Sequence, residues 1–331
     1  MESKAVLFDE IGGPEVLRLE KVALADPGAG EVLVRIDAIG LNRAEALFRS
    51  GGYWYDATLP GSRLGAEAAG EVVALGPEVD GFAPGDAVSV LATGTGMSHA
   101  GVYGDHVVVP ATTLLRRPAD MDAVTGAAVW LSYLTAYGAL VEVGRIAPGD
   151  HVVITAASSS VGVAAIQIVT ALGGVPVAVT RTEAKADRLR AVGAAHVVVA
   201  DGGPELVAKV REVTGDAGAR IVFDPVAGPG LADLATLVAR GGVLIVYGWL
   251  DPRPAPLPMN WPLNVWGYAL SALVADPEAL RRGQDFVHAG LRAGTLAPLI
   301  DRTFDLEEIV DAHRHMEANG QVGKIVVTVR H

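Results

Sequence analysis

The segment that most constrains the fold is an apolar, β-branched stretch that runs into a turn of small residues and then into an apolar helix. Residues 152–155 read VVIT, residues 156–160 read AASSS, and an apolar stretch begins at residue 161. A strand, turn and helix of this kind can hold a pyrophosphate against the helix N-terminus, where backbone N–H groups lack partners. Residues 152–163 therefore predict the first strand and helix of an α/β domain.

The pattern of predicted strands and helices changes near residue 128, and this change predicts two domains. Up to residue 128, short β-forming stretches are broken by glycine and proline turns, which is typical of an antiparallel or barrel-like domain. From residue 129 onward strands alternate with helices, the pattern of a doubly wound parallel sheet. We expect strands at 152–156, 175–180, 196–199, 220–224 and 243–248, and helices near 161–172, 183–192, 204–214 and 230–238. A last strand at 323–329 is expected to return to the first domain.

Composition narrows the class of protein. Half of the 331 residues are hydrophobic and only 19% are charged, which predicts a compact, soluble fold. The net charge of −12 argues against binding to nucleic acid or to an anionic membrane surface. We expect no secretory signal at the N-terminus and no apolar run of the roughly 18 to 20 residues that span a bilayer. The chain has no cysteine, which fits a reducing cytoplasm and excludes thiolate ligands for zinc.

The turn at 156–160 is a partial match to the glycine pattern of dinucleotide-binding proteins. Aligned with G-x-G-x-x-G, it supplies Ala157, Ser159 and Gly162, so that only the third glycine is kept. Small residues still allow a phosphate to approach, and we expect Ser159, Ser160 and Val161 to contact it. The alternative is a serine-rich turn in a sheet that binds no nucleotide.

Two cations follow the second strand of the α/β region. Arg181 lies nineteen residues after Gly162, where an NAD-binding protein usually has an acidic residue, and Lys185 follows about one helical turn later. Guanidinium and ammonium groups form charge-assisted hydrogen bonds with phosphate. Arg181 and Lys185 therefore predict a site for the 2′-phosphate of NADPH, although an ordinary solvated helix start explains them too. Thr182 is expected to cap that helix.

Other candidate cofactor-binding residues share a position at or just after the carboxyl end of a strand, the edge of a parallel sheet that lines a ligand crevice. They are Thr180, Asp224, Val226, Tyr247 and Gly248. Ordinary turns would explain each of them equally well.

Taken together, these motifs resemble the zinc-free quinone oxidoreductases related to ζ-crystallin, within the medium-chain dehydrogenase/reductase superfamily. The resemblance extends over essentially the whole chain. It rests on AV at 5–6, GGPEVL at 12–17, PGAGEVLV at 27–34, NRAE at 42–45, RSG at 49–51, GAEAAG at 65–70, LTAY at 134–137 and GKIV at 323–326. It implies a GroES-like, mostly β catalytic domain at 1–128 and 275–331, and a Rossmann NADPH-binding domain at 129–274. It also implies a homodimer, with the strand near 266–270 as a candidate for edge pairing.

The resemblance also bears on metal binding. Zinc-dependent relatives have a cysteine near position 42 and a histidine before the glutamate of a Gly-His-Glu triplet. This chain has Asn42 and the triplet Gly65-Ala66-Glu67 at those places. A catalytic zinc needs about three protein ligands, so we expect no metal, and His99 and His106 are expected to be ordinary surface or hydrogen-bonded residues.

Without a metal, reduction of a quinone or an α,β-unsaturated carbonyl by hydride transfer is easier than oxidation of an alcohol. We expect Asn42 to orient cofactor and acceptor, and Tyr53, which follows the Arg49-Ser50-Gly51 motif, to donate a hydrogen bond or proton. Asn42 could instead hold a loop, Tyr53 could be a pocket wall, and Tyr55 is a rival donor. The resemblance adds Thr135 and Lys324 to the cofactor-binding set. Glu67 is expected to be structural, bonded to backbone or to an arginine.

Three functions remain open from the sequence. The first is NADPH-dependent reduction of quinones or enones, with a small electrophilic acceptor as the substrate. The second is reduction of an enoyl-thioester bound to CoA or to a carrier, in which a tyrosine in a similar place donates the proton. The third is a weakly catalytic NADPH-binding protein.

Overall fold

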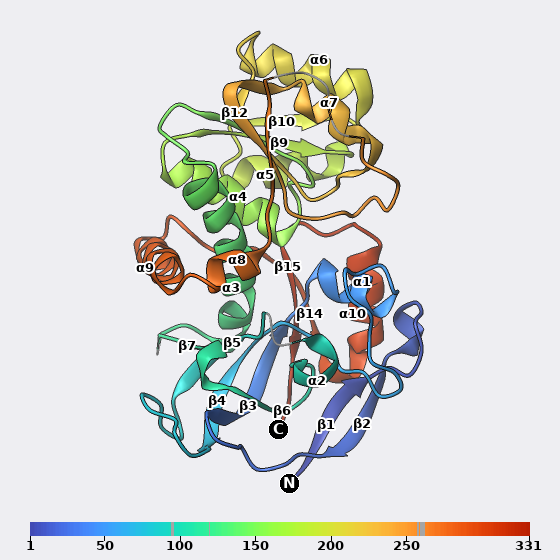
Figure 1. Cartoon of the computed structure of the whole chain (residues 1–331), viewed down its shortest axis with the longest axis vertical. Coiled ribbons are helices and arrows are strands. Elements are labelled where there is room, and N and C mark those ends of the chain that lie inside the picture. The colour runs from blue at the N-terminus through green and yellow to red at the C-terminus, as the bar shows by residue number, and fades with distance from the viewer. Residues whose placement is uncertain (94–95, 119, 257, 259–261) are drawn as a thin grey trace. The chain divides into compact units, whose positions relative to one another are not determined.

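The computed structural model describes residues 1–93, 96–118, 120–256, 258 and 262–331. The chain divides into two compact units, the first formed by Met1–Leu131 with Ile300–His331 and the second by Ser132–Leu299 (Figure 1). Residues 275–299, which we assigned to the catalytic domain, lie in the second unit.

The physical reason for that difference is the packing of helix α9 (Pro277–Ala293). Its Arg282 forms an ion pair with Glu142, and a side chain at Gly283 would collide with Leu134 and Tyr137. α9 therefore packs closely on the helical segment that opens the second unit.

The first unit is built on a sheet whose strands follow the order β14-β15-β3-β4-β5-β7, with β6 paired to β3. The strands are β3 (Glu31–Gly40), β4 (Glu67–Leu75), β5 (Ala87–Leu91), β6 (His106–Pro110), β7 (Leu114–Arg116), β14 (Ile300–Asp305) and β15 (Lys324–Thr328). β1 (Glu2–Leu7) and β2 (Arg18–Ala23) form a separate antiparallel pair. The helices are α1 (Arg43–Arg49), α2 (Met97–Ala100) and α10 (Ile309–Glu317). β15 joins β3 directly, which confirms that the chain's end returns to the first domain.

One apolar core holds this unit together. Val32, Val34 and Ile36 of β3 are buried together with Phe48 of α1 and Val327 of β15. Alternate residues of a strand point to opposite faces, so the apolar alternation of β3 directs one face into this core. Burying α1 and β15 against the same strand brings residues 42–49 close to residues 313–325, and this proximity creates the site described below.

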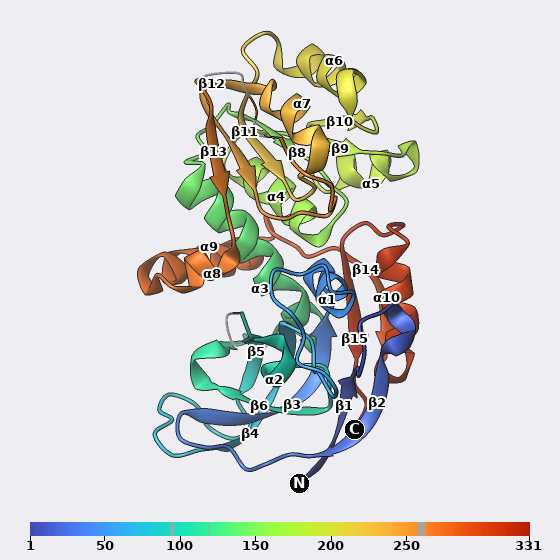
Figure 2. The same ribbon diagram turned by 45° about the vertical axis from the view of Figure 1, so that its right-hand side comes forward.

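The second unit contains a six-stranded parallel sheet in the order β10-β9-β8-β11-β12-β13, which confirms the predicted doubly wound fold. Its strands are β8 (His151–Ile154), β9 (Val175–Thr180), β10 (His196–Val199), β11 (Ala219–Asp224), β12 (Val238–Val246) and β13 (Asn264–Gly267). Its helices are α4 (Ser160–Ala171), α5 (Ala186–Ala191), α6 (Gly203–Thr214), α7 (Leu231–Ala235) and α8 (Leu270–Val274), besides α9. Figure 2 shows α6 and α7 beside each other on this sheet.

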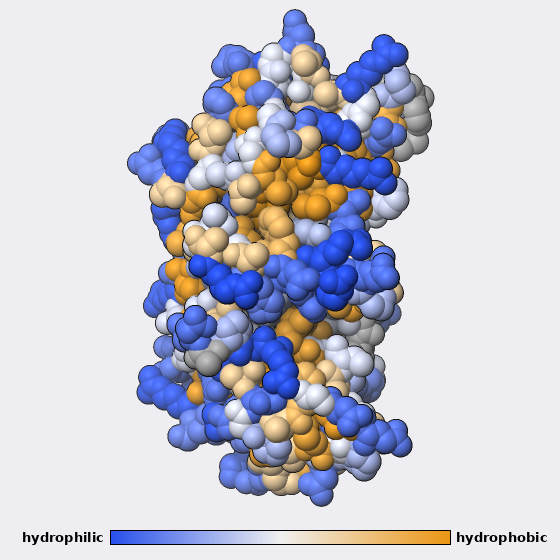
Figure 3. All heavy atoms as spheres, turned by 90° about the vertical axis from the view of Figure 1, so that its left-hand side faces the viewer, coloured by the Kyte–Doolittle hydropathy of each residue, from blue (hydrophilic) through white to orange (hydrophobic). Residues whose placement is uncertain are grey.

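Two predicted boundaries near the fifth strand were wrong. The helix expected at 230–238 ends at Ala235, and β12 begins at Val238 rather than at residue 243. The early start of β12 allows Val238 to pair with Ala219 of β11. At the sheet's edge, β13 exposes Val265 and Trp266, and Figure 3 shows apolar atoms gathered on the face of this unit that it displays.

Helix α3 (Ala123–Tyr137) continues as a π-helix through Gly138–Val143. Over these 21 residues the helix is long and apolar enough to cross a membrane. We had expected no apolar segment of that length. However, 78% of its most apolar window is buried inside the protein. A core helix has the same length and composition, so this segment is weak evidence for a membrane span.

Candidate active site

The predicted phosphate-binding turn joins β8 to α4. Ser159 is the N-cap of α4, and its Oγ accepts a hydrogen bond from the backbone N–H of Gly162 at 3.0 Å. A Cβ at Gly162 would lie 2.5 Å from the carbonyl oxygen of Ala157, so this position requires glycine. The backbone N–H groups of Ser160 and Val161 lie in the first helical turn, where no intrahelical acceptor exists. The turn therefore offers the backbone donors that a pyrophosphate requires.

The two predicted cations occupy different environments. Lys185 Nζ donates to Ser158 Oγ at 3.0 Å, which links the segment after β9 to the turn before α4. Arg181 is exposed, and Thr180 is buried at the end of β9. Thr182 is the N-cap of a short 3-10 helix, Glu183–Lys185, as predicted, but its side chain makes no capping hydrogen bond. A cation anchored beside a helix N-terminus fits an anionic ligand.

Asp224 holds the loop that directly follows it in the chain. Its carboxylate is buried and accepts hydrogen bonds from Thr155 Oγ1 and from the backbone N–H groups of Val226 and Ala227. Burial raises the pKa of Asp224, while the hydrogen bonds oppose this shift. These bonds hold the loop after β11, and Ala227 keeps a positive φ of 56° there. Asp224 therefore fixes the backbone of the loop that follows β11.

The residues after β12 contact both β11 and the loop that follows it. The ring of Tyr247 stacks on Phe223 with centroids 4.0 Å apart, and burial raises the pKa of its hydroxyl. A Cβ at Gly248 would lie 2.7 Å from the carbonyl oxygen of Pro225. Thr135 is buried in the last turn of α3.

In the first unit, Asn42 lies between β3 and α1 and its amide is bonded at both ends. Its Nδ2 donates to the carbonyl oxygen of Gly40 at 3.0 Å and to Glu45 Oε1 at 3.3 Å. Its Oδ1 accepts from Lys324 Nζ at 2.6 Å. Both amide hydrogens are therefore in use, whereas an amide oxygen has two lone pairs. Asn42 can still accept a hydrogen bond from a ligand, but its amide has no further hydrogen to donate.

Lys324 and Glu67 form a buried ion pair beside Asn42. Lys324 Nζ lies 2.6 Å from Glu67 Oε2, and both side chains are essentially inaccessible to water. Glu67 Oε1 also accepts from the backbone N–H of Leu131 at 2.9 Å. Glu67 therefore bonds to backbone, as expected, but its charged partner is a lysine rather than an arginine. A Cβ at Gly40 would lie 1.9 Å from the carbonyl oxygen of Ala127 and 3.0 Å from Glu67 Oε2, so this cluster requires glycine there.

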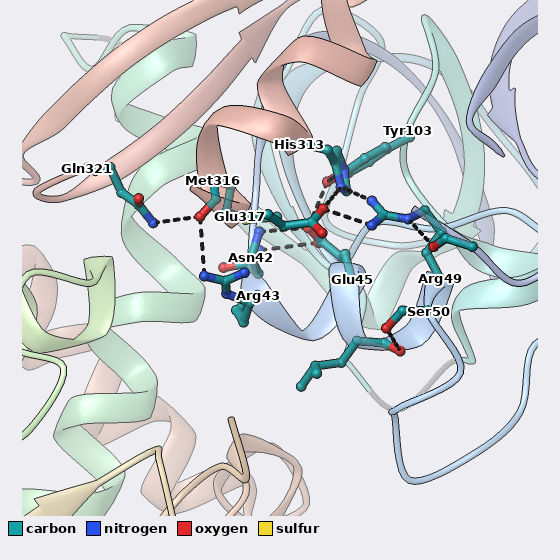
Figure 4. Close-up of polar contacts among 12 residues, drawn as sticks. Asn42, Arg43, Glu45, Arg49, Ser50, Tyr103, His313, Met316, Glu317 and Gln321 are labelled. Atoms are coloured by element: carbon teal, nitrogen blue, oxygen red, sulfur yellow. Dashed lines mark hydrogen bonds and ion pairs between the residues drawn. The ribbon is translucent and has the colours of Figure 1, made fainter. Parts of the chain in front are cut away.

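A second set of buried polar residues continues from Asn42 (Figure 4). Tyr103 OH donates to Glu45 Oε2 at 2.7 Å, and His313 Nε2 lies 3.3 Å from Tyr103 OH. Arg49 donates from NH1 to His313 Nδ1 at 2.7 Å and from NH2 to Glu317 at 2.8 Å. The sequence did not predict these residues as part of a site, and Glu45 and Arg49 appeared only as members of the NRAE and RSG motifs. The N-x-x-E spacing at 42–45, typical of a helix capping box, was the one signal that could have found Glu45.

Tyr53 belongs to an aromatic cluster with Phe48, Trp54 and Tyr55. Its ring is 4.9 Å from that of Tyr55, and burial raises the pKa of the Tyr53 hydroxyl, which therefore keeps its proton at neutral pH. The hydroxyl of Tyr55 accepts from the backbone N–H of Met97 at 3.2 Å. That bond ties the Tyr55 hydroxyl to the backbone of α2.

Histidines and carboxylates in the described part of the chain do not gather in groups of three or more that could hold a metal ion. His106 bonds to Asp105, and His315 bonds to Asp301. His99 is exposed on α2.

His313 should make stability depend on pH. Burial, then the charges of Arg49 and Arg43, lower its pKa to about 3 from the ordinary 6.5. Between these values the unfolded chain takes up a proton that the folded chain refuses, so stability falls as pH falls below 6.5. At pH 5 the loss is about 2 kcal/mol relative to pH 7. Denaturant unfolding of the His313→Gln variant at both pH values should show a correspondingly weaker pH dependence, whereas exposed His99→Gln should behave as the parent chain does.

Comparison with known proteins agrees with this architecture. Residues 28–119 match the alcohol dehydrogenase GroES-like domain, and residues 192–327 match a zinc-binding dehydrogenase domain. Human quinone oxidoreductase is 29% identical over 98% of this chain and 97% of its own length. A Burkholderia 2-haloacrylate reductase is 28% identical over 98% of each chain.

Among solved structures, a mycobacterial protein in complex with NADPH is similar, with a TM-score of 0.88 and 26% identity over 98% of this chain and 99% of that one. The matches extend over both units and preserve the order of the GroES-like and nucleotide-binding domains. The chain therefore belongs to the quinone oxidoreductase family of the medium-chain dehydrogenase/reductase superfamily.

Proposed function

We propose that this protein uses NADPH to reduce quinones or α,β-unsaturated carbonyls by hydride transfer without a metal. The observation that carries the proposal is the turn before α4, where Lys185 is anchored on Ser158 and Arg181 takes the place of the usual acidic residue. Quinone and 2-haloacrylate reductases among the relatives act, by their names, on electron-poor acceptors of this kind. The NADPH complex of a similar structure supports the choice of cofactor.

The residues of the second unit fit NADPH. The backbone N–H groups of Ser160 and Val161, with the cap at Ser159, would bind the pyrophosphate at the N-terminus of α4. Arg181 and Lys185 would bind the 2′-phosphate. When bound, NADPH supplies the hydride. The remaining candidates of this unit would complete its part of the cofactor site: Thr135, Thr180, Asp224, Val226, Tyr247 and Gly248.

In this proposal Asn42 and Tyr53 have complementary roles. Asn42 can only accept a further hydrogen bond, so it would orient a hydroxyl or amide N–H of the cofactor rather than polarise an acceptor's carbonyl. Tyr53 keeps its proton at neutral pH and would donate to the oxygen on which negative charge develops. Lys324 would act through Asn42, whose oxygen it holds.

The choice of NADPH over NADH is tested by reversing the charge of Arg181. Arg181→Glu removes a charge-assisted bond, which is typically worth about 1.5–3 kcal/mol, so the NADPH dissociation constant should rise about 10- to 100-fold. Affinity for NADH should stay nearly unchanged. Arg190→Glu is the matched control, because Arg190 is an exposed arginine of α5 paired with Asp187. Fluorescence titration measures both cofactors, and an unaltered preference in Arg181→Glu would exclude Arg181 from the phosphate site.

The acceptor is tested by a panel of quinones, enones and enoyl-thioesters with NADPH. We expect turnover of the first two classes. Turnover confined to enoyl-thioesters would favour a thioester reductase, and tight NADPH binding without any turnover would favour a cofactor-binding role.

We further propose a homodimer, paired through the exposed edge strand β13. Val265 and Trp266 of that strand are exposed in the single chain, and light scattering measures its mass in solution.

A cytoplasmic location stays a prediction from the cysteine-free composition.

A further inference from the structure

The carboxylate of Glu45 is fully buried and surrounded by donors. Its Oε2 accepts from the backbone N–H of Asn42 at 2.6 Å and from Tyr103 OH at 2.7 Å. Its Oε1 accepts from the backbone N–H of Ala66 at 3.0 Å and from Asn42 Nδ2 at 3.3 Å. Four donors use the principal lone-pair sites of an ionised carboxylate. Burial raises the pKa of Glu45, and the donors around its carboxyl group oppose this shift.

Arg49, His313 and Tyr103 form a chain of hydrogen bonds in which each group donates to the next, and the last one donates to Glu45. Arginine can only donate, so the 2.7 Å contact of Arg49 with His313 Nδ1 makes that nitrogen an acceptor. The neutral ring then carries its proton on Nε2, which faces Tyr103 OH at 3.3 Å. Tyr103 in turn directs its own hydrogen to Glu45. A fully buried cation, Arg49, is therefore linked through two neutral groups to a buried carboxylate.

Glu45 and Lys324 together allow Asn42 only one orientation. The ammonium of Lys324 requires the amide oxygen, while Glu45 and the carbonyl of Gly40 require the amide nitrogen. Rotating the amide by half a turn would place donor against donor and acceptor against acceptor. An unpaired buried polar group costs about 1–3 kcal/mol, so the rotated form is suppressed.

We propose that Glu45 is a positioning residue that orients Asn42 toward the nicotinamide half of NADPH, with Arg49, His313 and Tyr103 holding Glu45 in place. This inference rests on the proposed function, in which Asn42 meets the cofactor. Glu45 itself touches no ligand in this scheme. It acts by fixing which atom of Asn42 remains able to accept a hydrogen bond.

The test uses two ligands that share an adenosine end. NADPH has the nicotinamide half, and 2′,5′-ADP lacks it. In the Glu45→Gln variant an amide N–H₂ replaces one acceptor oxygen and faces donors, so that Asn42 is held in its orientation only by Lys324 and the carbonyl of Gly40. We expect the dissociation constant for NADPH to rise about five- to tenfold, the effect of one lost hydrogen bond, while that for 2′,5′-ADP is unchanged. Calorimetric titration of the full chain measures both, at a temperature where circular dichroism shows the variant folded.

Two further variants sharpen this test. If Glu45 acts through Asn42, then Asn42→Ala combined with Glu45→Gln should bind NADPH no more weakly than Asn42→Ala alone. Tyr103→Phe removes a single donor to Glu45 and keeps the ring, so it should weaken NADPH binding about two- to threefold and leave 2′,5′-ADP unaffected. Tyr103→Phe also decides the question if Glu45→Gln does not fold.

Arg43→Gln is the matched control. Arg43 lies on the same helix and bonds to Asn319 and to the carbonyl oxygen of Met316, away from Glu45 (Figure 4). Both affinities should stay at the parental value in this variant. Equal losses for both ligands in the Glu45 and Tyr103 variants, additive losses with Asn42→Ala, or no loss at all would overturn the positioning role. Failure of the parent chain to bind NADPH would instead refute the proposed function.

Discussion

Replacing Lys324 with methionine should lower the free energy of unfolding by about 3–5 kcal/mol, because the carboxyl group of Glu67 would be left buried without its partner. The pair is inaccessible to water, and Glu67 also accepts a hydrogen bond from the backbone N–H of Leu131. Asn42 Oδ1 would lose its ammonium donor as well. Chemical denaturation, followed by fluorescence and circular dichroism, measures the change.

Two comparisons test the physical cause of this loss. Lys21→Met breaks an exposed Lys–Glu pair in the same unit and should cost less than about 1 kcal/mol. Adding Glu67→Gln to Lys324→Met removes the unpaired carboxyl group and should restore part of the lost stability. If the double variant is as unstable as the sum of the two single variants, the penalty does not come from an unpaired carboxyl group.

Replacing Tyr53 with phenylalanine should lower kcat about 100-fold and leave NADPH affinity nearly intact, since proton donation by a positioned side chain contributes at least that much. Burial raises the pKa of Tyr53 above its usual 10, so the hydroxyl is protonated throughout the neutral range. Ionisation of Tyr53 should therefore not lower the turnover of the parent chain between neutral and mildly alkaline pH. Steady-state rates with a quinone or an enone, together with fluorescence titration of NADPH, measure both effects.

Tyr55→Phe is the control for that prediction. It removes a hydroxyl of the same cluster that bonds to the backbone of Met97, so it should cost about 1 kcal/mol of stability with little change in kcat. Full activity in Tyr53→Phe, or an equal loss in both variants, would remove Tyr53 from the role of proton donor.

Much of the secondary structure could be predicted from the sequence, because it depends on residues that are neighbours along the chain. The β-branched residues at 152–154 and the serine cap followed by Gly162 define a strand, a turn and a helix start within a dozen residues. β9 and β10 have the predicted bounds for the same reason. Residues 275–299 were misassigned because an amphipathic helix such as α9 shows which face it buries but not what it buries that face against.

The polar cluster around Asn42 could be predicted only in part. Its N-x-x-E spacing is local, and the resemblance pointed to Asn42 and Lys324. The contacts themselves join residues far apart in the chain: Lys324 meets Glu67 and Asn42, and His313 meets Arg49. No periodicity in the sequence records such pairs.

The sequence by itself determined the two-domain α/β architecture, the turn before α4 and the cations after β9, since each follows from short-range patterns of polarity and backbone preference. Only the tertiary structure decided which buried charges are paired and which end of Asn42 remains open to a ligand. The reason is that β15 and α10 pack against β3 and α1 in one apolar core, and a buried charge persists only where such packing provides its partner.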